Sequence, residues 1–393
     1  MKQKTNILAK QNNKYVVKVN TKKQLDEFIM LPFDLYNDDE YWVAPLISDT
    51  KKHLDTKKNP FFEYAESQYF LAFIDNTVVG RISAHTNPNH NHFHNEKKGF
   101  FGFFECIDDQ EVADLLFLEA EKWLLEKDCD IISGPFNFTT NDECGLLIDG
   151  FASSPFIMMT YNHSYYPNLL ENYGFKKEMD MYAWFLESNS MPKFLEKVGL
   201  KMEKNSQFSI RCLDKKNLKK DIATVFTIYQ KAWERNWGFV PMTKSEFDKL
   251  VETLLPIVDN ELVLIAEVDG KPAGFSVALP DYNIILKKIR GKINPITLIK
   301  IMLQKKKISS ARIITMGVVH EFQGIGIDSL FYYYTWKFCL SKGINKGEFS
   351  WVLETNTMMN KIAKHLGASI HKTYRIYDKK IHGTDTHIKG KLD

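Results

Sequence analysis

The residues best suited to carry out chemistry lie in one stretch, between an apolar β-branched run and an apolar helical pattern. It reads Met316-Gly317-Val318-Val319-His320-Glu321-Phe322-Gln323-Gly324-Ile325-Gly326-Ile327-Asp328-Ser329-Leu330. This order predicts a buried strand, a glycine-rich turn and the N-terminus of a helix. Unpaired backbone N–H groups at such a turn attract an anion, and glycines let a phosphate approach the backbone closely. The sequence therefore predicts an anionic, phosphate-bearing ligand at this turn.

The order of residues within the turn is more specific than the glycines alone. Gln323-x-x-Gly326, after a strand and before an apolar helix, resembles the acyl-CoA pyrophosphate loop of the GNAT acyltransferase superfamily, usually Arg/Gln-x-x-Gly-x-Gly/Ala. Asp328 stands where that pattern has its second small residue. Its carboxylate could cap the first helical turn or, facing the pyrophosphate, repel it. The resemblance implies acyl-CoA as co-substrate, bound by Val318, Val319, Gln323, Gly324, Ile325, Gly326, Ile327, Asp328 and, further on, Asn356, which could also cap the next helix.

Transfer of an acyl group to an amine requires a base to deprotonate the amine, and an acid can assist the leaving thiolate. Many GNAT enzymes carry a tyrosine four residues before the glycine that ends the last helix, and here that position is Ala363. His320 and Glu321 are the titratable residues nearest the strand that would face the thioester. We therefore expect the base among them, the alternative being that both are ordinary exposed loop residues.

The chain repeats one plan twice. Hairpins are predicted around Asp75-Asn76 and Asp269-Gly270, and helices that end at a glycine are predicted before Gly174 and Gly367. Gly80 and Gly274 of the hairpins are 194 residues apart, and Gly174 and Gly367 are 193 apart. The expected fold is α/β (α+β), with two GNAT-like domains in tandem, each a twisted mixed sheet flanked by helices. Their predicted bounds are 15–190 and 205–380, with a polar leader (1–14), a linker (191–204) and a polar tail (381–393).

Each copy carries one long excursion. In the first copy residues 134–163 are dense in polar side chains and lead into an aromatic group, which predicts either a site for a polar ligand head or a self-capping loop. The substrate-binding candidates here are Asn137, Asp142, Glu143, Tyr165 and Tyr166. The part of this copy that corresponds to the glycine turn, 104–110, is acidic and lacks glycine. We therefore expect one acyl-CoA site, in the second copy.

The excursion of the second copy, 281–310, differs in character. Its segment 283–307 combines isoleucine and leucine with many Lys and Arg residues and no acid. Two short amphipathic helices interrupted at 291–295 fit this pattern. They would either lie on an anionic membrane and admit a long-chain amine, or form a packed helix pair with a solvated basic face.

Composition limits the other possibilities. A formal net charge of +3 gives no reason to expect nucleic acid. The five cysteines form no C-x-x-C pair, and the histidines 85, 90, 92 and 94 lack acidic or cysteine partners nearby, so neither a disulfide framework nor a metal site is predicted. The N-terminus has no apolar signal region, and no run of about 18 apolar residues occurs. We expect a cytoplasmic protein that can be peripheral on the inner membrane face.

Three segments resemble one bacterial group of tandem GNAT-like proteins: 232–241, which contains Trp237, 134–137 and 317–328. This group is taken to include the bacterial ceramide synthases, which acylate a sphingoid amine from fatty acyl-CoA. The resemblance implies an acyl-CoA-dependent N-acyltransferase acting on a hydrophobic long-chain amine, with Trp237 near the substrate. Two alternatives stay open. One is an N-acetyltransferase for a small amine or peptide, and the other is a non-catalytic ligand-binding protein with this fold.

Overall fold

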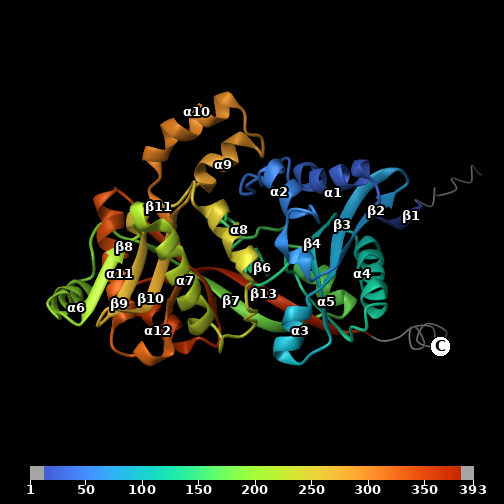
Figure 1. The fold of residues 1–393 in the computed structure, drawn as a ribbon. Coiled ribbons are helices and arrows are strands. Elements are labelled where there is room, and N and C mark those ends of the chain that lie inside the picture. The colour runs from blue at the N-terminus through green and yellow to red at the C-terminus, as the bar shows by residue number, and fades with distance from the viewer. Residues whose placement is uncertain (1–12, 382–393) are drawn as a thin grey trace, which may run out of the picture.

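The computed structural model describes residues 13–381 (Figure 1). The polar leader and polar tail expected from the sequence lie almost wholly outside these residues. Within them, strands and helices alternate along both halves, as the fold class predicted from the sequence requires.

The first half contributes β1 to β7 to the sheet, with helices on its faces. Its strands are β1 (Lys14–Lys18), β2 (Ser67–Ile74), β3 (Thr77–Thr86), β4 (Lys98–Cys106), β5 (Ile131–Gly134), β6 (Leu146–Asp149) and β7 (Lys176–Glu187). Its helices are α1 (Lys22–Leu35), α2 (Ile47–His53), α3 (Pro88–His94), α4 (Gln110–Leu125) and α5 (Tyr166–Tyr173), with a 3₁₀ turn η1 (Pro60–Glu63).

The second half follows the same order, with an insertion. Its strands are β8 (Phe208–Cys212), β9 (Val263–Val268), β10 (Lys271–Pro280), β11 (Ser310–Val318), β12 (Lys346–Leu353) and β13 (Ser369–Lys380). Its helices are α6 (Lys193–Glu203), α7 (Leu218–Ala232), α8 (Lys244–Leu254), α9 (Asn283–Ile289), α10 (Pro295–Gln304), α11 (Ile327–Ser341) and α12 (Thr357–His365). Short 3₁₀ turns are η2 (Lys215–Asn217), η3 (Asn260–Leu262), η4 (Lys305–Lys307) and η5 (His320–Phe322).

Local sequence explains where these elements begin and turn. Thr21 and Gln24 form a capping box at the start of α1, and Asp109 accepts the first free N–H groups of α4. The predicted hairpins are confirmed: β2 pairs with β3 and β9 with β10, in both cases antiparallel. The C-cap of α5 is Gly174, whose φ of 105° suits glycine.

The two halves share one sheet and exchange their last strands. The sheet runs in the order β1-β2-β3-β4-β5-β13-β7-β12-β11-β10-β9-β8, with β6 pairing to β13 beside this path. Thus β7, which ends the first half, pairs with β12 of the second, while β13, which ends the second half, pairs with β5 of the first. The domain bounds taken from the sequence remain a prediction, but the halves they define are joined through backbone hydrogen bonds at the centre of the sheet.

In each half the parallel pair of strands parts after a few residues. β11 pairs with β12 only from Ser310 to Ile313, and β4 pairs with β5 only from Lys98 to Phe100. A register shift between β10 and β11 falls next to the parting point, between Val277 and Ala278. A bulge of this kind turns a strand away from its neighbour. Both halves therefore contain a splayed pair of central strands.

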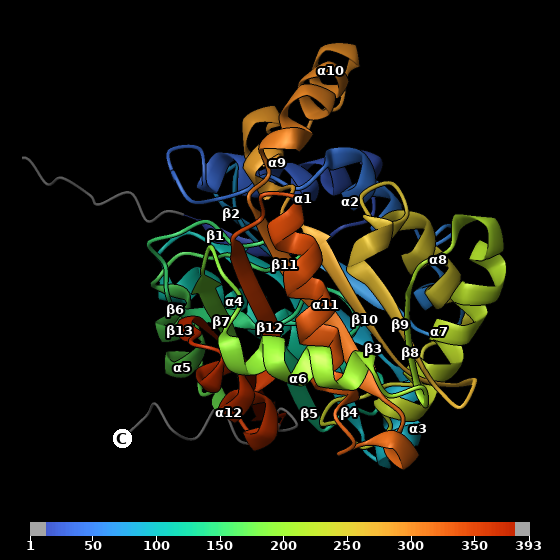
Figure 2. The same cartoon turned by 90° about the vertical axis from the view of Figure 1, so that its left-hand side faces the viewer.

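The insertion of the second half forms the two helices predicted from the sequence, α9 and α10. Figures 1 and 2 both show α10 extending outward from the edge of the molecule, beyond the other helices. None of the helices within residues 13–381 is long and apolar enough to pass through a lipid bilayer.

Two tyrosines on the exchanged strand β13 differ in whether their hydroxyl groups have a hydrogen-bond partner. Tyr374 and Tyr377 are both fully buried, but the Tyr377 hydroxyl donates to Glu171 Oε1 at 2.9 Å. The Tyr374 hydroxyl has no partner within the described residues. Since a buried unpaired hydroxyl costs about 1–3 kcal/mol, Tyr374→Phe should raise the free energy of unfolding by about 1 kcal/mol. Tyr377→Phe should lower it by a similar amount, and urea unfolding curves of the two variants should shift in opposite directions. Equal shifts would contradict the difference in hydrogen bonding between the two hydroxyls.

Candidate active site

The glycine turn after β11 presents unpaired backbone donors and is open at Gly324. Gly324 and Gly326 have φ of 78° and 97°. A Cβ added to Gly324 would meet no atom within 4 Å, whereas one added to Gly326 would come within 2.9 Å of Met202 Cε. In the hydrogen bonds found for residues 13–381, the backbone N–H groups of 324–329 have no acceptor. They lie at the N-terminus of α11, a helix of 15 residues, where the helix dipole favours negative charge. Free donors at a helix N-terminus suit an anion, and the binding of a pyrophosphate by this turn stays a prediction.

The side chains before the turn form a chain of hydrogen bonds back to β11. Gln323 Nε2 donates to the carbonyl of Val318 at 3.1 Å, and Gln323 Oε1 lies 3.2 Å from His320 Nδ1. Arg235 Nη1 lies 3.1 Å from His320 Nε2. Because arginine can only donate, His320 accepts at Nε2 and donates at Nδ1. Both ring nitrogens of this candidate base are thus engaged, whereas Glu321 is exposed and, in the part of the chain that is described, makes no ion pair.

The corresponding site of the first half is filled by its own chain. Phe136 N donates to the carbonyl of Phe101 at 2.8 Å, and Asn137 Oδ1 accepts from Phe103 N at 2.8 Å. The segment after β5 therefore occupies the gap between β4 and β5. A Cβ on Gly102 would come within 1.8 Å of the Phe136 carbonyl oxygen, so the contact is tight. A pantetheine arm would have no room in this gap.

Beside the splay of β11 and β12 lies a cavity of about 320 Å³, which we call the apolar cavity. The second half supplies most of its wall: Leu218, Ile222, Val225 and Tyr229 of α7, Phe247, Leu250, Val251 and Leu254 of α8, and Val263, Phe275, Val277, Thr315 and Leu353 of the sheet. The first half adds Thr140, Asn141, Asp142, Cys144 and Met158. A hydrocarbon chain fits such a lining better than a polar ligand does.

Hydrogen bonds fix the excursion of the first half against the second half at this cavity. Tyr229 Oη donates to Asn141 Oδ1 at 2.5 Å, and Thr140 Oγ1 donates to the carbonyl of Gly238 at 2.8 Å. Arg312 Nη1 donates to the carbonyls of Ile157 and Met158 at 2.8 and 3.1 Å. The cavity is therefore composite, and neither half encloses it alone.

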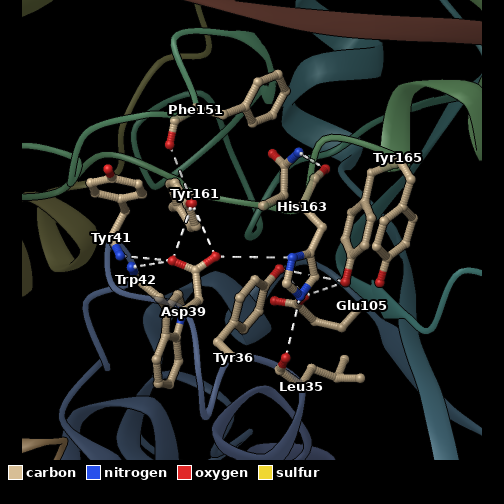
Figure 3. A network of polar contacts seen from close by, with 12 residues as sticks. Leu35, Tyr36, Asp39, Tyr41, Trp42, Glu105, Phe151, Tyr161, His163 and Tyr165 are labelled. Carbon is tan, nitrogen blue, oxygen red and sulfur yellow. Dashed lines mark hydrogen bonds and ion pairs between the residues drawn. The ribbon is translucent and has the colours of Figure 1, made fainter.

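A buried polar network anchors the end of the same excursion (Figure 3). Tyr36 and Tyr166 each donate to Glu105 Oε2 at 2.7 Å, and Tyr161 Oη donates to both carboxylate oxygens of Asp39. His163 stacks on Tyr36 with ring centroids 4.4 Å apart. Burial raises the pKa of Glu105 and, more strongly, of both tyrosine hydroxyls. This network holds the loop that walls the cavity.

The structure distributes the predicted substrate-binding residues over different environments. Asp142 lines the apolar cavity, and Trp237 lines it as well. Glu143 is exposed, yet the protein around it raises the pKa of its carboxyl by desolvation. Asn137 accepts a hydrogen bond from Phe103 N within the filled gap between β4 and β5. Tyr165 and Tyr166 belong to the network of Figure 3, where Tyr165 Oη donates to the carbonyl of Cys106 at 2.7 Å.

Three other positions singled out in the sequence have clear local surroundings. Asn356 is the N-cap of α12, where its side chain accepts from Met359 N at 3.1 Å, so capping accounts for its side-chain oxygen. Ala363 lies on the buried face of α12, within the core. Asp328 lies in the first turn of α11 but makes no capping hydrogen bond within the described residues, where Gly326 is the N-cap.

The roles of α7 and α8 as walls of the site do not follow from the sequence pattern. Their apolar residues recur at helical spacing, but such spacing is equally typical of helices that pack on a filled core. The role of Trp233 does not follow from the sequence either. A Cβ on Gly317 would come within 2.2 Å of the Trp233 ring. This indole therefore covers β11 just before the predicted thioester position. In residues 13–381 no group of three or more His, Cys, Asp or Glu side chains is arranged to hold a metal ion.

Comparisons with known proteins agree with this geometry. The chain is 35% identical over 372 residues to a bacterial ceramide synthase of Caulobacter vibrioides, covering 93% of this chain and 97% of that protein. It is 33% identical over 372 residues to Protein YghO of Escherichia coli, covering 92% and 94%. No family model matches the sequence.

Solved structures show a similar fold at low sequence identity. A tandem GNAT protein from the clavulanic acid biosynthesis pathway has a TM-score of 0.57 and 11% identity, covering 95% of this chain and 100% of that chain. A GCN5-related N-acetyltransferase from Sphaerobacter thermophilus has a TM-score of 0.52 and 12% identity, covering 94% and 96%.

The turn can be tested with a matched pair of glycines. Gly324 and Gly343 have φ of 78° and 74°, and neither has an atom within 4 Å of an added Cβ. Alanine should strain both positions equally, by about 1 kcal/mol. Only Gly324→Ala distorts the bend that presents the free amides, so it should weaken coenzyme A binding about tenfold, corresponding to about 1.4 kcal/mol. Titration calorimetry of both variants measures this difference. Equal affinities would rule out the turn as the pyrophosphate site.

Proposed function

Since the chain belongs to the tandem GNAT family of acyltransferases, we propose that it transfers a fatty acyl group from coenzyme A to a hydrophobic long-chain amine. The observation that carries this proposal is the apolar cavity beside the splayed strands. The name of the relative from Caulobacter vibrioides, a ceramide synthase, supports the same substrate class.

The proposed reaction uses the free edge of β11. From Ile314 onward this strand has no partner on its β12 side among the described residues, so its N–H groups there can bind the thioester carbonyl and stabilise the developing oxyanion. The amine nitrogen attacks the carbonyl carbon, the C–S bond breaks, and the thiolate leaves with a proton. Glu321 and His320 remain the proposed bases. Of the two, only Glu321 has no hydrogen-bond or ion-pair partner in residues 13–381.

The two alternative functions fit the geometry less well. A small amine or a peptide N-terminus would leave the apolar cavity empty beside the reacting atoms. The side chains that line the cavity would then lack the van der Waals contacts that a hydrocarbon chain provides. A protein that had lost catalysis would have no need to keep the amides of 324–329 unpaired and accessible.

We further propose that α10 lies on an anionic bilayer. Its exposed residues include Ile296, Leu298, Ile299, Met302 and Leu303, of which Met302 is 76% exposed. Basic residues precede the helix at 287–292 and follow it at 305–307. A projecting helix with an apolar surface and lysines at its ends suits the boundary between headgroups and acyl chains of anionic lipids. This arrangement would bring the enzyme to the membrane in which a long-chain amine resides.

Narrowing the cavity should change the choice of acceptor. Ile222 lines the cavity from α7 and is only half-buried, so tryptophan there should fill space without unfolding the protein. Ile222→Trp should lower kcat/KM for a long-chain amine about tenfold, a loss of about 1.4 kcal/mol, while a short-chain amine is affected little. Ile222→Leu conserves volume and serves as the control.

Both amines are assayed with palmitoyl-CoA and with acetyl-CoA. If the variant discriminated by the length of the acyl donor rather than of the amine, the cavity would hold the acyl chain and the assignment to the acceptor would be wrong. If the native protein transferred only acetyl groups to small amines, the first alternative function would replace the proposal.

Membrane contact can be tested by co-flotation with vesicles of phosphatidylglycerol and phosphatidylcholine. Met302→Glu places a charge on the apolar surface of α10 and should reduce the bound fraction severalfold. Met358→Glu is the control, because Met358 is 67% exposed but lies on α12. Binding should fall with added salt, since lysines contribute. Equal retention of both variants would exclude α10 as the contact surface.

A further inference from the structure

A second cavity lies between the two halves and differs sharply from the first. It has a volume of about 410 Å³, and we call it the polar cavity. From the first half it is lined by α3 and by the starts of β4 and β7, and from the second half by the segment 234–240 that follows α7. Its wall includes the histidines of α3 and the tryptophan segment 234–240, of which the proposed acyl-transfer step uses only Arg235, the partner of His320.

The charges around this cavity are not evenly balanced. Lys98 is already neutralised, since its Nζ lies 3.0 Å from Asp378 Oδ2 and 3.5 Å from Glu96 Oε2. Arg235 is directed at His320. Glu178 accepts only from Trp237 Nε1, at 3.2 Å, and Glu234 makes no ion pair or hydrogen bond in residues 13–381. Within those residues neither Glu178 nor Glu234 makes an ion pair, although Glu178 lies near enough to Lys98 to help raise the pKa of that ammonium.

His90 does not add a positive charge to this wall. Burial, together with neighbouring His94, lowers the pKa of His90 to about 4, so His90 is neutral near pH 7. His94 Nε2 lies 2.9 Å from the carbonyl of Phe239, to which it can only donate. With three carboxylates (Glu96, Glu178 and Glu234) against two cations (Lys98 and Arg235) in its wall, the polar cavity is suited to a cation that also carries hydrogen-bonding groups.

The polar cavity adjoins the apolar cavity through a common wall. Thr140, Asn236, Trp237 and Gly238 line both. Trp237 presents its indole to this boundary while its Nε1 holds Glu178. Trp233 of the same segment covers Gly317 on β11, so the boundary lies close to the strand that would face the thioester. An amphipathic molecule could place its tail in one cavity and its head in the other.

We propose that the polar cavity is the subsite for the acceptor's head group, and that it selects a protonated amine with hydrogen-bonding substituents next to the nitrogen. This inference rests on the proposed acyl transfer to a long-chain amine. Glu178 and Glu234 pair with the ammonium group as it enters, while Ser133 and Thr140 offer hydroxyls to its substituents. The hydrocarbon tail lies beyond Trp237 in the apolar cavity. The ammonium then gives a proton to one of the proposed bases, His320 or Glu321, and the neutral nitrogen attacks the thioester carbonyl.

The test measures the KM values of both substrates in charge-neutralising variants. Glu178→Gln keeps the acceptor atom for Trp237 but removes the charge. Glu234→Gln removes the charge of a carboxylate that has no hydrogen-bond partner in residues 13–381. Each should raise KM for a long-chain 2-amino-1,3-diol about fivefold to tenfold, and the double variant more, while KM for palmitoyl-CoA stays unchanged. Glu187→Gln is the matched control, because Glu187 is an exposed residue at the far end of β7, the strand that carries Glu178.

A comparison of acceptors tests the selectivity. The native protein should prefer the amino diol to an unsubstituted alkylamine of equal chain length, and the double variant should lose most of this preference. Unchanged KM values for the amine in the double variant would overturn the proposal. Calorimetric titration of the amino diol alone, without any acyl donor, separates this outcome from failure of the proposed function. Binding that is weakened by the double substitution supports the subsite even if no acyl transfer is found, and equal binding rejects it.

Discussion

The free edge of β11 is the feature on which the rest of the structure depends. Four residue pairs join β11 to β12, and beyond Ile313 the strands part. An unpaired strand edge inside a sheet is costly, because its buried N–H and C=O groups need partners. A ligand with amide groups of its own, such as pantetheine, satisfies this edge as a strand would. The geometry of the sheet, more than any single side chain, therefore determines where a thioester can lie.

The first half shows how the same architecture becomes closed. There the chain supplies its own substitute for a ligand, with Phe136 bonded to Phe101 and the Asn137 side chain bonded to Phe103. Asp109 also satisfies the first N–H groups of α4, whereas the corresponding groups of α11 have no acceptor in residues 13–381. The first copy of the repeat thus has no open gap between its central strands and forms part of the wall around the other copy's cavity. Its excursion, held by the network of Asp39, Glu105 and the tyrosines, encloses the cavity of the other copy.

The parts of this structure that depend on local patterns could be predicted from the sequence. Hairpins, glycine-terminated helices, the turn at 323–328 and the paired helices of the insertion all follow from residue types at close spacing. The exchange of β7 and β13 does not, because either strand could pair with either partner without a change in its pattern. The apolar cavity could not be predicted for a related reason. Ile222 and Val225 have the spacing of core residues, and only the tertiary arrangement shows that space remains in front of them.

A buried ion pair, at the point where β11 and β12 part, helps to position a loop of the first half against the second half. Arg312 and Glu348 are 2% and 1% exposed, and their charged groups lie 3.7 Å apart. Such pairs repay their desolvation only when hydrogen bonds satisfy the remaining donors. Arg312 donates to Ser350 and to the carbonyls of Ile157 and Met158, which belong to the first half. A hydrophobic residue could fill this space with less desolvation, but it could not specify these partners. The pair therefore contributes less to stability than to the position of one half's loop over the other half's open strand.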